Sequence, residues 1–69
     1  MKFMFITIFK DPEGLPRGWG RADTPETSET AARWQCREYC QEKNSIPNRR
    51  SRLSIQSFTF ETTEDILCV

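Results

Sequence analysis

Apolar and polar positions follow different spacings along the chain, and each spacing predicts one kind of element. Residues 3–9, read FMFITIF, are apolar at both odd and even positions except for Thr7. Aromatic and β-branched residues favour strands, and a strand with two apolar faces is typical of a sheet centre. We therefore predict a central strand, with a helix over one face. The other face needs a different cover, which is the following loop, a second chain or a partner.

Residues 24–44 carry a helical pattern. Small and apolar residues recur three or four positions apart and form one face, which consists of Ala32, Cys36, Tyr39 and Cys40. Thr24 is a suitable N-cap and is followed by Pro25, a residue favoured at the first helical position. Asn44 and Pro47 are typical of a helix end. The pattern predicts one helix over about residues 24–44.

The rest of the chain predicts a long loop and two more strands. Residues 11–23 contain three glycines and two prolines and are expected to form a loop, and residues 47–52 a basic turn. Residues 53–61 resemble a strand whose phase slips near Gln56, as a β-bulge would cause. Residues 62–65 resemble a turn, and 66–69 a short final strand. The expected fold is a single α+β domain over residues 1–69, in the order β-α-β-β, with one helix packed on a face of a small antiparallel sheet.

Trp34 lies on the side of the predicted helix opposite its apolar face. At about 100° per residue, its side chain points nearly opposite the apolar face and lies near Arg33, Arg37 and Gln41. An exposed indole beside two arginines is costly unless another surface covers it. Trp19, between two glycines in the predicted loop, is either an anchor for that loop or a second contact residue. The two tryptophans packing on each other is the simplest intramolecular alternative.

Size, charge and cysteine content narrow the function classes. The chain has 69 residues, which is one small domain, and 10 basic residues balance 10 acidic ones. Zero net charge argues against a protein that coats nucleic acid non-specifically. Three cysteines, with no recognisable signal peptide, indicate reduced thiols and a cytoplasmic protein. The apolar start is too short to span a membrane, so no membrane partner is expected.

Catalytic and metal chemistry find little support in the sequence. Histidine, the commonest general base, is absent, and no glycine-rich phosphate loop has the required spacing. Cys36 and Cys40 share a helical face and, with Cys68, offer at most three thiolates, whereas a structural zinc site needs four ligands. Free cysteines on an apolar face usually pack in a core. We therefore expect no enzyme, no metal site and no cofactor.

Protein binding is the function that the pattern favours. Interface hot spots are enriched in Trp, Tyr and Arg, and the predicted partner-binding residues are Trp34, Arg33, Arg37, Gln41 and Trp19. One alternative is a small nucleic-acid-binding protein, in which the contacts come from Arg49, Arg50 and Arg52. A second alternative is a structural homodimer, in which a twin chain covers the second face of the strand at residues 3–9.

Several segments resemble a family of small uncharacterised proteins encoded by enterobacterial prophages. The resemblance rests on the opening strand at residues 2–10, on the Gly-Leu-Pro run at residues 14–16, on Trp19 and Arg21, on the helical Cys36, and on residues 54–60. It implies a phage or prophage accessory protein that acts inside a bacterial cell, where such small proteins often bind host factors. It implies no activity and no functional residues.

Overall fold

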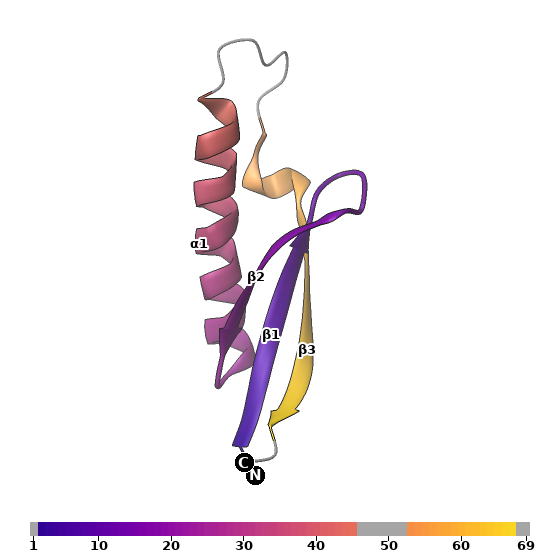
Figure 1. Ribbon diagram of the computed structural model, residues 1–69, viewed down its shortest axis with the longest axis vertical. Helices are drawn as coiled ribbons and strands as arrows, with labels where there is room; N and C mark the ends of the chain where they lie inside the picture. Colours follow the sequence, from indigo (N-terminus) through magenta and orange to yellow (C-terminus); the bar gives the residue numbers. More distant parts are fainter. Residues whose placement is uncertain (1, 46–52, 68–69) are drawn as a thin grey trace.

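A computed structural model describes residues 2–45 and 53–67 of the chain. In this part, the chain forms a three-stranded antiparallel sheet with one helix packed on it (Figure 1). In chain order, the elements are β1 (Lys2–Lys10), β2 (Pro16–Ala22), α1 (Pro25–Asn44), the short 3-10 helix η1 (Ile55–Ser57) and β3 (Thr59–Leu67). The predicted α+β class, a small antiparallel sheet with one helix on a face, is confirmed.

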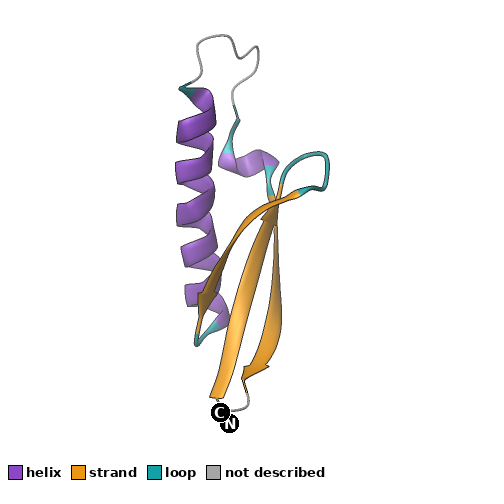
Figure 2. Cartoon of the chain, in the orientation of Figure 1, coloured by secondary structure: helices purple, strands orange, loops and turns teal. Residues whose placement is uncertain are grey.

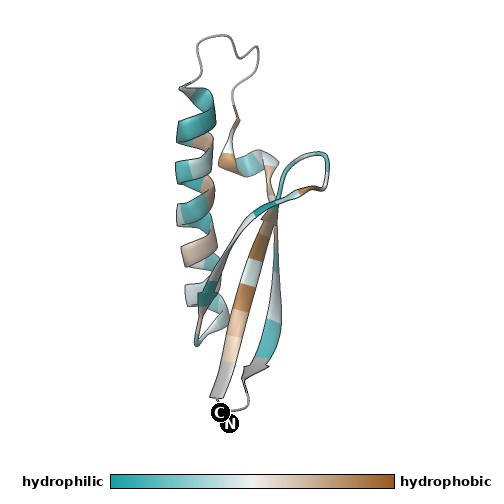
Figure 3. Cartoon of the chain, in the orientation of Figure 1, coloured by the Kyte–Doolittle hydropathy of each residue, from teal (hydrophilic) through white to brown (hydrophobic). Residues whose placement is uncertain are grey.

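The central position of β1 is also confirmed. The strand order is β2-β1-β3, so that β1 pairs on both sides, and Figure 2 shows it between its two neighbours. Thr7 lies opposite Gly20 of β2 and opposite Thr62 of β3. The most hydrophobic strand in Figure 3 is β1. Its apolar side chains therefore extend along the middle of both sheet faces.

The predicted element order is wrong, because a second strand precedes the helix. The order is β-β-α-β rather than β-α-β-β, and β2 occupies most of the segment expected to be a loop at residues 11–23. Glycine and proline are poor strand formers in general, but they are tolerated at strand starts, at edges and where another backbone comes close. Pro16 begins β2, which is an edge strand, and Gly20 lies beneath the helix.

The connection between β1 and β2 is short, and Asp11 organises it. Its carboxylate accepts hydrogen bonds from the backbone N–H groups of Glu13 at 3.0 Å and Leu15 at 2.9 Å, and from Nε of Arg17 at 2.8 Å. Burial alone would raise the pKa of Asp11, but the hydrogen bonds from Leu15 and Arg17 lower it overall. Gly14 has a φ of 87°, in a region that favours glycine. Together these features let the chain reverse direction between the two strands.

The segment after the helix also differs from the prediction. The phase slip near Gln56 is the 3-10 helix η1 rather than a β-bulge. Residues 62–65, expected to form a turn, lie within β3, which continues to Leu67 instead of giving way to a separate final strand. β3 is polar because it is an edge strand with exposed residues on both faces. The basic turn expected at residues 47–52 lies outside the described residues.

α1 approaches the sheet along a stripe of small residues. The helix has the predicted range, with the side chain of Thr24 capping its first turn. The stripe is fully or almost fully buried and repeats every four residues, as Ser28, Ala32, Cys36 and Cys40. A Cβ atom added to Gly20 would collide with the backbone nitrogen of Ala32 and lie 2.8 Å from the carbonyl oxygen of Ser28. Small residues on both surfaces thus allow the backbones to pack together.

Beyond this contact, the space between helix and sheet widens and aromatic residues fill it. Phe9 is 1% exposed, and its ring centroid lies 6.3 Å from that of Tyr39, 5.9 Å from that of Phe58 and 6.1 Å from that of Phe60. Edge-to-face and tilted contacts of this kind suit aromatic quadrupoles. The core therefore has an aromatic end at Phe9 and a close-packed end at Gly20.

Hydroxyl groups occupy the close-packed end. Ser28 Oγ donates to the carbonyl oxygen of Gly20 at 3.3 Å, and Thr7 Oγ1 lies 2.7 Å from both Ser28 Oγ and Thr62 Oγ1. A hydroxyl has one proton, so Thr7 donates to Ser28, and Thr62 donates to Thr7. The chain of hydrogen bonds links helix and all three strands, and it satisfies the polar groups that the close approach buries.

Candidate functional site

Trp34 projects away from the sheet, as the helical pattern predicted. Its side chain is on the opposite side of α1 from Ala32 and Cys36, and the residue is 60% exposed. Tryptophan is enriched among the residues that contribute most to binding at protein interfaces. Trp34 is therefore the starting point for a candidate binding surface.

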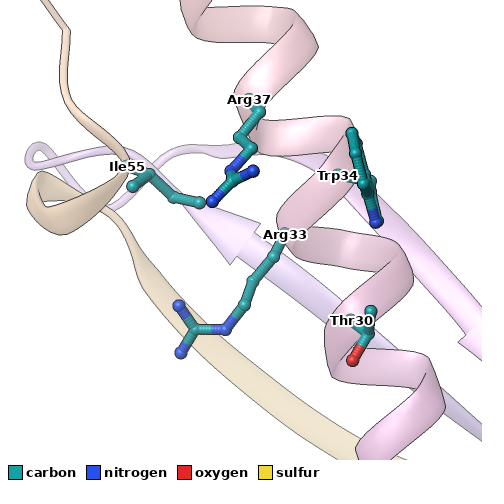
Figure 4. A pocket seen from close by; sticks show the side chains of 5 residues that line it. All are labelled: Thr30, Arg33, Trp34, Arg37 and Ile55. Atoms are coloured by element: carbon teal, nitrogen blue, oxygen red, sulfur yellow. The ribbon is translucent and has the colours of Figure 1, made fainter.

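A shallow groove of about 220 Å³ lies beside Trp34. We call it the helix groove, and its lining residues are Thr30, Arg33, Trp34, Arg37 and Ile55 (Figure 4). Figure 4 shows the two arginine side chains extending from the helix on the side that faces Ile55, with the indole on the other side. The lining of the groove is therefore apolar at Ile55 and Trp34, and the guanidinium groups of Arg33 and Arg37 supply its charge.

The two arginines have different surroundings. Nη2 of Arg33 lies 3.0 Å from a carboxylate oxygen of Glu29, and its guanidinium lies 4.8 Å from the ring centroid of Phe60. The guanidinium of Arg37 lies 5.6 Å from the ring centroid of Trp34, a cation–π contact. Within the described residues, Arg37 forms no ion pair. Its charge is therefore available to a ligand to a greater extent than that of Arg33.

The structure brings together three of the five predicted partner-binding residues. Arg33, Trp34 and Arg37 line one groove, while Gln41 is exposed one helical turn further along and does not line it. The sequence interpretation missed Thr30 and Ile55. The i−4 spacing of Thr30 from Trp34 was a usable signal, whereas Ile55 reaches the groove only through tertiary packing.

Trp19 belongs to a different surface. It lies on β2 opposite Ile8, is 57% exposed, and borders a hollow between β2 and α1 that includes Ala31 and Gln35. The alternative in which Trp19 packs on Trp34 is wrong, because the aromatic contacts of the described residues connect Phe9, Tyr39, Phe58 and Phe60 instead. The two indoles therefore lie on two separate faces of the protein.

Both tryptophans should be open to a soluble quencher in the dilute protein. We expect iodide to quench Trp34 in a Trp19→Phe variant and Trp19 in a Trp34→Phe variant, each with a Stern–Volmer constant near that of an exposed indole. The reason is their exposure of 57% for Trp19 and 60% for Trp34. An emission maximum typical of a buried indole, with weak quenching in either variant, would contradict the placement of that residue.

The cysteines on the helix belong to the core. Cys36 and Cys40 are free thiols, buried in the cluster that contains Phe9 and Phe58. Burial, with Cys40 nearby, raises the pKa of Cys36 to about 12. A thiol with so high a pKa is a poor nucleophile and a poor metal ligand at neutral pH. The expectation that these two residues pack as small hydrophobic side chains is confirmed, and Cys68 lies outside the described residues.

The residues of the nucleic-acid alternative are not placed. Arg49, Arg50 and Arg52 lie in the segment 46–52, outside the described residues. Within the described residues, no helix combines the length and the apolar character that crossing a bilayer requires.

Comparison with known proteins supplies no relative from which a function can be transferred. No protein-family model, curated protein or solved structure gives a significant match to this chain. The function is therefore inferred from the helix groove and from the faces of the sheet.

Proposed function

We propose that this chain is a non-enzymatic protein-interaction module whose partner-binding surface is the helix groove. The observation that carries the proposal is the exposure of Trp34, which is 60% exposed, lines the groove and has the guanidinium of Arg37 at 5.6 Å from its ring centroid. Hot spots of protein interfaces combine Trp with Arg because the indole supplies apolar area and the guanidinium supplies directed hydrogen bonds. Gln41, one turn beyond, extends the surface.

The chemistry of the groove favours a partner segment with a carboxylate next to an apolar side chain. Arg37 is positioned to donate two parallel hydrogen bonds to a carboxylate. Ile55 and the indole of Trp34 offer apolar contact on either side. Glu29 already accepts from Arg33, so that Arg37 is expected to supply most of the charge recognition.

The sequence adds the biological setting of the proposal. The absence of histidine and the engagement of Glu61 and Asp65 in ion pairs with Lys10 and Arg21 support a role without catalysis. The resemblance to prophage-encoded proteins and the free thiols support a phage or prophage accessory protein of the bacterial cytoplasm, with a host protein as the partner.

Affinity capture with matched variants tests the proposal. The full chain is immobilised, and proteins retained from a bacterial lysate are quantified for wild type, Trp34→Ala and Arg37→Glu. We expect each substitution to weaken the binding affinity for a specific partner by about 30-fold, because truncating a hot-spot residue costs about 2 kcal/mol or more of binding free energy. If both variants retain the same proteins as wild type in the same amounts, the helix groove is not the binding surface.

The control is Trp19→Ala, which removes an indole of similar exposure from another face. It should leave the captured partner unchanged, because Trp19 does not line the helix groove. Far-UV circular dichroism of all three variants establishes that each is folded. Loss of the partner in Trp19→Ala but not in Trp34→Ala would move the site to the sheet.

A further inference from the structure

The sheet face opposite the helix, which we call the open face, is apolar in the middle and charged at its margins. Register places Met4, Ile6 and Ile8 of β1 on this face, and all three are partly exposed. Trp19 lies opposite Ile8 on β2. No described element packs over these residues, since α1 covers the other face (Figure 2).

Charges on the open face are separated by strand. Arg21 lies on β2 and Lys10 on β1, whereas Glu61 and Asp65 lie on β3. One ion pair crosses the face from β2 to β3, with Arg21 Nη2 3.3 Å from Asp65 Oδ2. A second joins the adjacent strands β1 and β3, with Lys10 Nζ 3.0 Å from Glu61 Oε2. The β3 margin is therefore acidic, the β2 margin carries Arg21, and the row of β1 between them is apolar except for Lys10 at its end.

This arrangement is complementary to itself under one particular symmetry. A two-fold axis parallel to the strands, placed between two copies face to face, puts the β3 of each copy over the β2 of the other. Arg21 then faces the acidic margin of the second copy, and the apolar row of β1 meets its equivalent. An axis perpendicular to the strands would place β3 over β3 and bring like charges together, which is unfavourable.

We propose that the open face binds the open face of a second copy of this chain, forming a two-fold symmetric sandwich of two sheets with α1 on each outer side. The strands of the two sheets would cross at roughly 30°, as in aligned sheet packings. The contact covers three strands spaced about 4.8 Å apart, which is narrow compared with standard interfaces. The dimer is therefore expected to form in the micromolar range or above. It leaves the helix groove exposed and does not depend on the proposed function.

Charge-reversal variants separate this contact from the ion pair within one chain. In sedimentation velocity over a concentration series, Arg21→Glu alone and Asp65→Arg alone should each weaken dimerisation by about tenfold or more, because like charges then face each other. Mixing the two variants should restore a dimer, because the glutamate introduced in the first variant then faces the arginine introduced in the second. The pairing is between chains, so neither variant can restore it alone.

Matched controls and a second readout complete the test. Lys43→Glu and Glu38→Arg make the same charge changes on α1 and should dimerise like wild type. In Trp34→Phe, iodide quenching of Trp19 should fall as protein concentration rises, while in Trp19→Phe the quenching of Trp34 should not change. A protein that stays monomeric throughout the series, or mixed variants that do not associate, would overturn the proposal. Association abolished by the α1 controls would also overturn it.

Discussion

Replacing Gly20 by alanine should destabilise the protein by about 3 kcal/mol or more, at the upper end of what overpacking costs. The added Cβ atom meets backbone atoms, namely the nitrogen of Ala32 and, at 2.8 Å, the carbonyl oxygen of Ser28. Backbone cannot rotate away as a side chain can, so α1 must shift from the sheet and stretch the hydrogen bond between Thr7 and Ser28. The decrease in the free energy of unfolding is measured by urea denaturation monitored by circular dichroism.

Gly18→Ala is the matched control for this prediction. Gly18 lies two residues away on the same face of β2, but the three atoms nearest to its added Cβ atom would all be ring atoms of Phe9. Displacing the ring of the buried Phe9 also costs stability, but less than separating two backbones, so we expect a smaller loss of stability than for Gly20→Ala. Equal stabilities of wild type and Gly20→Ala would mean that the helix does not lie against β2 as described.

Phe9→Ala should remove most of the stability that the domain has. Truncating a buried phenylalanine costs about 3–5 kcal/mol, and a small domain with one core is expected to hold only a few kcal/mol in total. Phe9 is the central ring of the cluster with Tyr39, Phe58 and Phe60. We expect weak, non-cooperative thermal unfolding, with loss of the near-UV circular dichroism signal.

The control for Phe9→Ala is Ile8→Ala, on the same strand but on the open face. Ile8 is partly exposed and belongs to the charged and apolar surface rather than to the core. Measured at a concentration where the chain is monomeric, Ile8→Ala should cost clearly less than Phe9→Ala. A Phe9→Ala variant that unfolds cooperatively with a loss of under about 1 kcal/mol would contradict the aromatic core.

Where each element's own pattern was strong, the sequence predicted it correctly. The apolar run of β1, interrupted only by Thr7, indicated a central strand, because a strand that is apolar on both faces is typical of the middle of a sheet. The capping residue Thr24 and the four-residue spacing of Ala32, Cys36 and Cys40 predicted the helix and its buried face. The same spacing placed Trp34 outside, so the main residue of the candidate site was found from helical geometry alone.

Where local pattern and tertiary context disagreed, the sequence interpretation failed. The Gly-Trp-Gly segment has the composition of a loop, yet it forms a strand. Its Gly20 has no side chain, which leaves room for the helix backbone at Ala32 to pack against the sheet. The Thr-Glu-rich segment of β3 has the composition of a turn, yet it pairs along the whole of β1. Edge strands receive their hydrogen bonds from a neighbour, so their own side chains need not carry a strong strand signal.

Periodicity was enough to establish the class of the fold, the central strand, the helix with its buried stripe, and the outward direction of Trp34. These features depend on the spacing of consecutive residues, which any reader of the sequence can measure. The folded chain was needed to show that β2 precedes the helix, that Ile55 completes the helix groove, and that Trp19 and Trp34 lie on separate faces. It was also needed to show that the charges of the open face separate by strand. All of these arise from contacts between residues far apart in the chain, which local spacing does not record.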